Sequence, residues 1–283
     1  MKIYFHSDLD GRCAGAIACR ALRDQNKGAK VELIELDYKD EIVVKEINPY
    51  EQVIIVDFSF KPEVMEKVLL LTKNIVWIDH HKTAFEYKYS EELRGIRDNK
   101  FSGCELTWKY FYGKKEMPRA VELIGDKDKW AWKFGEHTAN FNMGMKLYDH
   151  QPEDKIWNRL FGLGAYFRLA EVSDIIEEGK ICIKFRDQFC KDYAKSYGFE
   201  TVFENYKCFA LGIYMFGSEA FGDRMKKYDI CLSYEYVGDS WIVGLYSIKD
   251  IDVSKIAQKY GGGGHTKAAG FVCRELPFKK HIM

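Results

Sequence analysis

Short apolar runs alternate with helical patterns in the N-terminal part of the chain. The runs are rich in Ile, Val and aromatic residues and cover residues 2–6, 31–36, 53–56 and 75–78. Such runs are typical of strands buried on both faces of a parallel sheet. The intervening residues 12–22 and 63–72 have helical patterns, the second beginning just after Pro62. This alternation predicts a parallel sheet with right-handed helical crossovers.

The C-terminal part has a different pattern. Residues 152–197 are mostly helical, and three apolar runs follow at residues 208–213, 230–237 and 240–246. Gly238-Asp239 between the last two runs predicts a hairpin turn. We therefore predict an α/β protein with a catalytic domain over residues 1–175, a helical linker over 176–200 and a smaller α/β domain over 201–283.

Acidic and imidazole side chains follow three of the four predicted parallel strands. They are His6, Asp8 and Asp10 after the first strand, Asp57 after the third, and Asp79, His80 and His81 after the fourth. Ligands of open α/β sheets bind at the carboxyl ends of the strands. Crowded carboxylates repel one another unless cations neutralise them. Mixed imidazole and carboxylate ligands favour Mn²⁺, while Zn, Fe or Co also fit the ligand types and Mg²⁺ fits them less well.

The alternative for residues 79–81 is a solvated turn with two incidental histidines. It would leave a carboxylate and two imidazoles near a core without partners, which is costly. A further Asp-x-Asp pair, Asp126 and Asp128, follows a predicted helix near residues 118–124. Such a pair in a loop is by itself typical of a solvated turn.

Two other segments have a pattern typical of anion binding. Ser102 is a predicted N-cap of a helix over residues 103–111, whose free N–H groups could receive a phosphate, although a plain capped helix fits equally well. Residues 261–264 are four consecutive glycines before His265, so the backbone could approach an anion closely. The spacing is not that of a P-loop. A flexible linker is the alternative, but the run continues into a predicted strand.

Composition narrows the class of partner. The 283 residues contain 43 Lys and Arg against 43 Asp and Glu, a formal net charge of +0. Proteins that hold long nucleic acid usually carry a basic excess, so we expect a small or short anionic partner instead.

The cysteines and the apolar runs bear on location. The eight cysteines include no CxxC pair, as expected of free thiols in a reducing cytoplasm. No apolar run approaches the roughly 20 residues needed to span a bilayer, and the first residues do not form a signal peptide. We expect a cytoplasmic protein without a membrane partner, and a homodimer remains open.

In this order the motifs resemble those of the DHH phosphoesterase superfamily, in its oligoribonuclease or nano-RNase-like branch. The matching residues are His6-Ser7-Asp8-Leu9-Asp10-Gly11, Asp57, Asp79-His80-His81, Asp126, and Gly262-Gly263-Gly264-His265 with Ala268-Ala269-Gly270-Phe271. The resemblance covers essentially the whole chain. It implies a parallel-sheet catalytic domain, a helical linker, and a smaller domain that closes over an active-site cleft.

The resemblance also implies two Mn²⁺ ions and a role for each matched residue. One ion would be held by His6, Asp8 and Asp57, and the other by Asp10, Asp57, His80 and Asp126. Asp57 would bridge the two, and Asp128 is the alternative to Asp126. Asp79 would orient His80, as carboxylates do for metal-bound histidines. His81 would contact the phosphate or support the ligands from behind.

For the substrate, the resemblance implies that Gly262, Gly263, Gly264 and His265 hold a terminal phosphate or sugar. Many family members have Ser-Leu-Arg-Ser where this chain has Gly244-Leu245-Tyr246-Ser247. Tyr246 can stack on a base or donate one hydrogen bond, but unlike arginine it cannot bind a phosphate through two parallel bonds.

We therefore expect a Mn²⁺-dependent phosphodiesterase that converts short oligoribonucleotides or linear dinucleotides to mononucleotides, or acts on adenosine 3′,5′-bisphosphate. Hydrolysis of pyrophosphate or polyphosphate is the first alternative. The second, from another class, is a non-catalytic nucleotide sensor on the same fold. A Rossmann-type cofactor enzyme is disfavoured, because no Gly-x-Gly-x-x-Gly follows the first strand.

Overall fold

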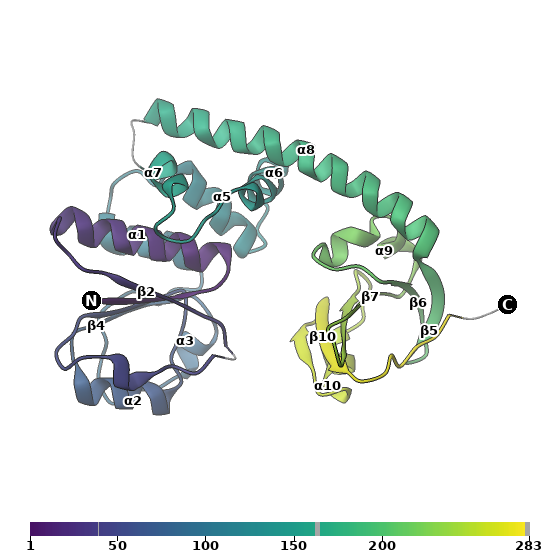
Figure 1. The fold of residues 1–283 in the computed structure, drawn as a ribbon, viewed down its shortest axis with the longest axis horizontal. Coiled ribbons are helices and arrows are strands. Elements are labelled where there is room, and N and C mark those ends of the chain that lie inside the picture. Colours follow the sequence, from purple (N-terminus) through teal and green to yellow (C-terminus); the bar gives the residue numbers. More distant parts are fainter. Residues whose placement is uncertain (39, 162–164, 281–283) are drawn as a thin grey trace. The chain divides into compact units, whose positions relative to one another are not determined.

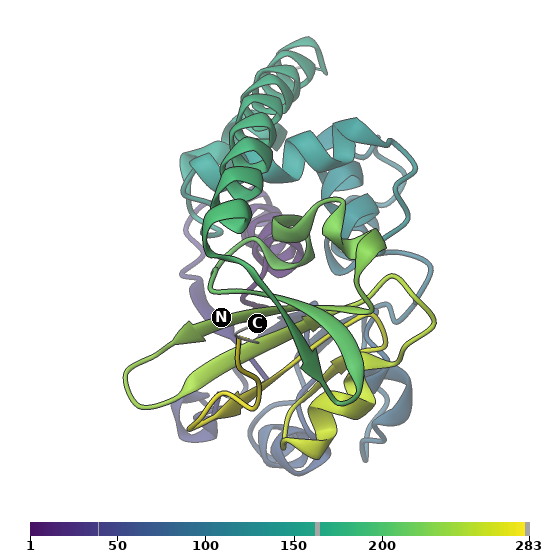
Figure 2. The same ribbon diagram turned by 90° about the vertical axis from the view of Figure 1, so that its right-hand side faces the viewer.

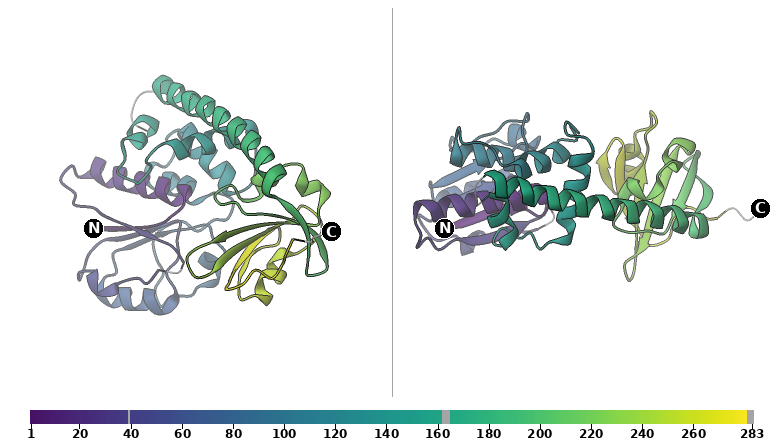
Figure 3. Two further views of the ribbon diagram at one scale, coloured as in Figure 1. Left: turned by 45° about the vertical axis from the view of Figure 1, so that its right-hand side comes forward. Right: turned by 90° about the horizontal axis from the view of Figure 1, so that it is seen from above.

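The chain separates into two compact units in a computed structural model that describes residues 1–38, 40–161 and 165–280. Unit 1 is Met1–Cys182 and unit 2 is Ile183–Met283. The boundary falls within α8, Ala165–Tyr197, which Figure 3 shows as one continuous helix. None of the helices in these described ranges is both long and apolar enough to cross a membrane.

Unit 1 is built on a four-stranded parallel sheet (Figure 1). Its strands are β1 (Lys2–His6), β2 (Glu32–Leu36), β3 (Val53–Val56) and β4 (Ile75–Ile78), in the order β2-β1-β3-β4. All neighbours pair in parallel. The mixed α/β class and the parallel sheet predicted from the apolar runs are confirmed.

Helices cover both faces of this sheet. Their bounds are α1 Leu9–Gln25, α2 Pro62–Leu71, α3 Thr83–Glu86, α4 Gly103–Tyr112, α5 Arg119–Asp128, α6 Glu136–Gly144 and α7 Lys155–Phe161, with short 3₁₀ turns η1 Val44–Glu46 and η2 Met145–Leu147. Alternate strand residues point to opposite faces. Ile3 and Phe5 therefore pack with α1, α4 and α5, whereas Tyr4 packs with α2 on the other face.

The turn from β1 into α1 is tight, and this places His6, Asp8 and Asp10 together. Asp8 caps α1 by accepting a hydrogen bond from the Gly11 N–H at 2.9 Å. A Cβ atom on Gly11 would lie only 2.3 Å from the carbonyl oxygen of His6. Glycine is thus required at this position, because any side chain would push the helix away from the strand end.

Unit 2 contains a six-stranded mixed sheet (Figure 2). The strands are β5 Phe199–Phe203, β6 Tyr206–Leu211, β7 Ile230–Tyr236, β8 Trp241–Tyr246, β9 Gly263–His265 and β10 Ala268–Cys273, in the order β5-β6-β7-β8-β10-β9. Only the β6–β7 pair among these is parallel. The helical elements are η3 Gly217–Phe221, α9 Arg224–Lys227 and α10 Val253–Lys259.

Candidate metal centre

Asp57 lies at the middle of the polar cluster that forms at the carboxyl end of the parallel sheet. Its side chain is completely buried, and its backbone has φ +55°, which is uncommon for a residue other than glycine. Neither carboxylate oxygen has a hydrogen-bond partner among the described residues. Buried polar atoms almost always have a hydrogen-bond partner, so the unpaired carboxylate of Asp57 indicates a ligand that is not part of the chain.

His6 and Asp8 approach Asp57 from β1 and the start of α1. His6 Nδ1 lies 3.8 Å from Asp57 Oδ2 and 3.1 Å from Asp8 Oδ2. The ligand atoms of the three residues all lie within 4.8 Å of one another. The ring of Tyr38 packs against the His6 ring at 5.2 Å and stacks on Phe58 at 5.1 Å, which limits the rotation of His6.

A second group surrounds the ring of His80. His80 Nε2 lies 3.1 Å from Asp57 Oδ1, 3.4 Å from Asp128 Oδ2 and 3.9 Å from Asp10 Oδ2. The ligand atoms of Asp10, His80 and Asp128 also fall within 4.8 Å of one another, as do those of Asp57, His80 and His81. Asp57 therefore belongs to two of these groups, and His80 also belongs to two.

The structure places Asp128, and not the predicted ligand Asp126, beside the other candidate metal ligands. Helix α5 continues through both residues, and positions two apart on a helix point about 200° apart. Asp128 faces the cluster. Asp126 points away, where its carboxylate accepts hydrogen bonds from the Lys133 N–H at 2.8 Å, the Phe134 N–H at 3.2 Å and the Thr138 hydroxyl.

The N-terminus of α4, where Ser102 is a predicted substrate contact, binds a carboxylate from the chain in this structure. Asp10 accepts hydrogen bonds from the Ser102 hydroxyl at 2.9 Å, the Gly103 N–H at 2.7 Å and the Cys104 N–H at 3.1 Å. Ser102 is fully buried and forms the predicted N-cap, here in a capping box with Glu105. The anion preference of a helix N-terminus thus positions Asp10.

Gly103 allows α4 to approach the centre of the cluster. A Cβ atom at this position would lie 2.4 Å from Asp57 Oδ1, a distance at which one group must move. The sequence analysis did not single out Gly103, since a glycine at the start of a helix has no distinctive pattern. Its function becomes evident only from the contact with Asp57.

Asp79 contacts the ring of His81, whereas the family resemblance implies that it orients His80. Asp79 Oδ1 lies 2.8 Å from His81 Nδ1 and accepts the backbone N–H groups of His80 and His81 at 2.7 and 3.1 Å. Its other oxygen accepts the buried Ser59 hydroxyl at 2.5 Å. The sequence analysis missed Ser59, although it follows Asp57 by two residues and so lies at the same sheet edge.

The ionisation of these groups favours cation binding. Burial, and then the charges of Asp10 and Asp8, raise the pKa of Asp57 well above its ordinary value and that of Asp128 to about 9. Burial lowers the pKa of His80, so its imidazole stays neutral. Burial opposes protonation of His6, but Asp8 raises its pKa above the ordinary value. The crowded carboxylates cannot all ionise unless a bound cation neutralises their charge. Together with neutral imidazole they form a donor set that suits divalent transition-metal ions.

The other predicted substrate residues lie in unit 2. Gly263–His265 form the exposed edge strand β9, where Gly263, Gly264 and His265 pair with Gly270, Ala269 and Ala268 of β10. Two of the four glycines, Gly263 and Gly264, therefore lie in a strand. A Cβ atom on Gly262 would lie 2.1 Å from the Gly270 carbonyl oxygen, so close packing requires that glycine. The half-buried ring of Tyr246 packs against Phe221 at 5.9 Å.

Comparison with known sequences supports the interpretation of the N-terminal part. Residues 1–126 match the DHH family, N-terminal domain. An uncharacterized protein of Acanthamoeba polyphaga mimivirus is 29% identical over 249 residues, which cover 81% of this chain but 56% of the relative. Oligoribonuclease NrnB of Bacillus subtilis (strain 168) is 26% identical over 298 residues, covering 95% of this chain and 71% of the relative. The chain thus spans little more than half of the viral relative.

Solved structures share the fold at low sequence identity. The pGpG-specific phosphodiesterase PggH from Vibrio cholerae superposes with a TM-score of 0.54 at 15% identity, over 96% of this chain and 93% of that one. Exonuclease RecJ bound to manganese gives a TM-score of 0.51 at 13% identity, over 96% and 85%. These likenesses establish a common fold.

Proposed function

We propose that this chain, whose residues 1–126 match the DHH family, is a metal-dependent phosphodiesterase that converts short oligoribonucleotides and linear dinucleotides to mononucleotides. The observation that carries the proposal is the buried Asp57 carboxylate, which has no hydrogen bond and is flanked by His6 and His80. The relative named an oligoribonuclease, which aligns over 95% of this chain, supports the substrate class. Adenosine 3′,5′-bisphosphate is a further candidate substrate of the same centre.

We assign two divalent cations to the centre, with Mn²⁺ preferred on donor type. His6, Asp8 and Asp57 would hold one ion, and Asp10, His80 and Asp128 the other, with Asp57 shared. The unsatisfied atoms His6 Nδ1, His80 Nε2 and both oxygens of Asp57 fit such a role. A pair of ions would supply a nucleophilic water at neutral pH and stabilise charge on the phosphoryl oxygens.

His81 is the protein group that we assign to the phosphate. Burial opposes ionisation of Asp79, but its hydrogen bond with His81 keeps the pKa of Asp79 below the ordinary value. An ionised Asp79 accepts the Nδ1–H of His81 and so leaves Nε2 for the substrate. This second ring nitrogen is the atom that we assign to a phosphoryl oxygen or to the leaving oxygen.

In unit 2, the family resemblance assigns the terminal phosphate or sugar to Gly262, Gly263, Gly264 and His265. The edge position of β9 supports this assignment, because an edge strand presents N–H groups that no neighbouring strand uses. Tyr246 remains a candidate for stacking on a base with the exposed part of its ring.

The proposal is tested by an endpoint assay with Mn²⁺. The substrates are a 5′-phosphorylated diribonucleotide, a longer oligomer, cyclic di-AMP, adenosine 3′,5′-bisphosphate and pyrophosphate. We expect rapid cleavage of the diribonucleotide and little of pyrophosphate. Cleavage of pyrophosphate alone would replace the proposal with phosphoanhydride hydrolysis. Tight binding of a nucleotide without turnover would instead indicate a sensor.

A further inference from the structure

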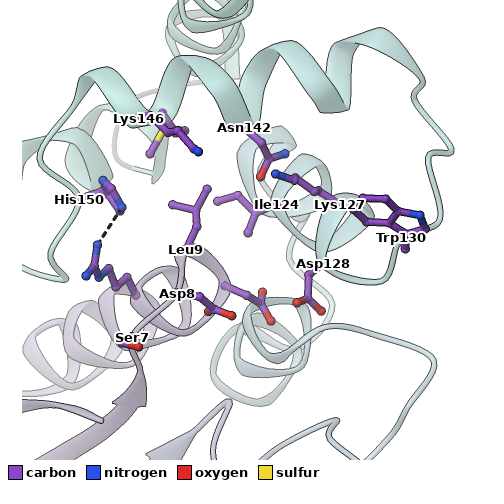
Figure 4. A pocket seen from close by; sticks show the side chains of 13 residues that line it. Ser7, Asp8, Leu9, Ile124, Lys127, Asp128, Trp130, Asn142, Lys146 and His150 are labelled. Carbon is purple, nitrogen blue, oxygen red and sulfur yellow. Dashed lines mark hydrogen bonds between the residues drawn. The ribbon is translucent and has the colours of Figure 1, made fainter. Parts of the chain in front are cut away.

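A cavity of about 440 Å³ lies beside the candidate metal centre, entirely within unit 1 (Figure 4). This volume is within the range of roughly 300–1,000 Å³ that is typical of small-molecule sites. The start of α1, the end of α5, and the segment from α6 to His150 form its walls. None of these elements carries a substrate residue in the function proposed above.

One end of the cavity is formed by three carboxylates of the metal centre, Asp8, Asp10 and Asp128. A ligand that occupies the cavity therefore reaches the atoms assigned to both cations. Leu9, Ile124 and Met145 form an apolar part of the wall. The cavity thus offers both an apolar surface and a connection to the charged centre, as a nucleotide requires.

Lys146 supplies a positively charged side chain to an anionic ligand in this cavity. Its side chain is exposed, and Figure 4 shows it pointing into the cavity across from Lys127 of α5. No hydrogen bond or ion pair of Lys146 is found with the residues that the structure describes. An ammonium group on a flexible stem, close to a carboxylate cluster that would hold cations, is suited to a phosphate.

Arg12 lines the same cavity but is already engaged. Its guanidinium makes two 3.0 Å hydrogen bonds to Glu35 and a third, also 3.0 Å, to His150 Nε2. His150 Nδ1 lies 2.8 Å from the carbonyl oxygen of Tyr148, so it donates there and Nε2 accepts from Arg12. These contacts make Arg12 and His150 a fixed part of the wall.

Trp130 is an exposed indole at the rim. Its side chain is 67% exposed, and its backbone has φ +54°, so the turn after α5 holds it in a sparsely populated conformation. Trp132 contacts it edge-to-face at 4.9 Å and fixes its orientation. A large aromatic surface held in place and left open to solvent is the arrangement on which nucleic-acid bases stack.

We propose that this cavity binds the nucleotide that carries the terminal phosphate, with Trp130 stacking on its base and Lys146 pairing with that phosphate, which leaves the sugar to the glycine segment of unit 2. The proposal rests on the phosphodiesterase function and deepens it. It predicts that a substrate with a base is favoured over pyrophosphate, which has no base to stack.

The test compares two diesters in the full-length protein with Mn²⁺. The first is a 5′-phosphorylated diribonucleotide, and the second is methyl p-nitrophenyl phosphate, which has neither a base nor a second phosphate. Trp130→Ala and Lys146→Met should each lower kcat/KM for the diribonucleotide by about tenfold, mainly through KM. Both should leave the small diester within about twofold, since neither residue contacts the centre.

Matched controls separate this role from general surface effects. Trp130→Phe should retain most of the diribonucleotide activity, because a phenyl ring also stacks. Tyr50→Ala and Lys114→Met change an exposed aromatic residue and an exposed lysine of the same unit away from the cavity, and should have no effect. Equal losses on both diesters, or no loss on the diribonucleotide, would overturn the inference while leaving the phosphodiesterase function intact.

If neither diester is cleaved, the proposed phosphodiesterase function is contradicted. A binding measurement then tests the subsite independently of turnover. Calorimetric titration of the diribonucleotide in the presence of Ca²⁺ should show about tenfold weaker binding in Trp130→Ala and Lys146→Met than in the wild type. Unchanged affinity in both variants would refute the subsite.

Discussion

His80 Nε2 lies 3.1 Å from Asp57 Oδ1, yet neither atom forms a hydrogen bond within the described part of the chain. Burial lowers the pKa of His80 and raises that of Asp57, so neither group is stable in its charged form without help. Two buried polar atoms this close and without a hydrogen bond are the arrangement that a shared cation would stabilise.

Asp128 and Asp126 give the sharpest comparison, because they lie on one helix and only Asp128 faces His80. Asp128→Asn should weaken Mn²⁺ binding and lower kcat by roughly 100-fold, since it removes a charged ligand. Asp126→Asn should instead lower the free energy of unfolding by about 1–3 kcal/mol, because it weakens the bonds to residues 133–138. Calorimetric Mn²⁺ titration and urea unfolding measure the two effects, and reversed results would restore Asp126 as the ligand.

The stability of the metal-free protein should fall as pH rises. Asp57 and Asp128 have raised pKa values in the folded state, about 9 for Asp128, against roughly 3.9 in the unfolded chain. The folded state therefore retains protons that the unfolded state loses. Their contribution is fully present below pH of about 4 and is lost as pH rises towards 9.

Thermal unfolding in a chelator between pH 5 and pH 9 measures this dependence. Asp57→Asn should flatten the slope, because the amide does not titrate. Added Mn²⁺ should raise Tm more at pH 8 than at pH 5, since the cation replaces the protons. If the Tm of the wild type and the Tm of Asp57→Asn depend on pH in the same way, the raised pKa assigned to Asp57 is contradicted.

Gly103→Ala should disable the centre by steric means. The added methyl group would sit 2.4 Å from Asp57 Oδ1 and displace either the carboxylate or the start of α4. We expect activity to fall by at least about 100-fold, with weaker Mn²⁺ binding. Gly28→Ala is the matched control, because its nearest contact would be an ordinary 3.5 Å, and it should change stability by less than about 0.5 kcal/mol.

Ser59→Ala tests the positioning of His81 through Asp79. The buried hydroxyl donates to Asp79, which in turn binds His81 Nδ1. Its loss should lower kcat about tenfold and change KM little, because outer partners of such centres contribute about 10–100-fold. The exposed Ser90, which bonds to Glu66, provides the control Ser90→Ala. An effect on KM alone would indicate that Ser59 does not act through His81.

The sequence identified the parallel sheet and the polar residues at its edge because both depend on local signals. Buried parallel strands produce uninterrupted apolar runs, and the chemistry follows directly after them. The direction of a side chain on α5 is not such a signal. Asp126 and Asp128 differ only in which side of the helix faces the sheet, and this depends on how α5 packs.

Ser102 and the glycine run illustrate the same limit. The capping pattern of Ser102 was readable, but its partner Asp10 lies 92 positions earlier in the chain, and only tertiary structure brings the two together. Glycine has a low β propensity, so the four glycines do not by themselves predict a strand. Pairing with β10 overrides that preference and makes Gly263–His265 a strand.

Anomalous diffraction from a crystal of the protein grown with Mn²⁺ locates the bound cations directly. We expect two peaks that share Asp57, one contacting His6 and Asp8 and the other contacting Asp10, His80 and Asp128. Asp57→Ala should abolish both peaks and leave less than about a hundredth of the activity while the circular dichroism spectrum is unchanged. A single peak, or a peak ligated by Asp126 in place of Asp128, would contradict the two-cation centre proposed for this chain.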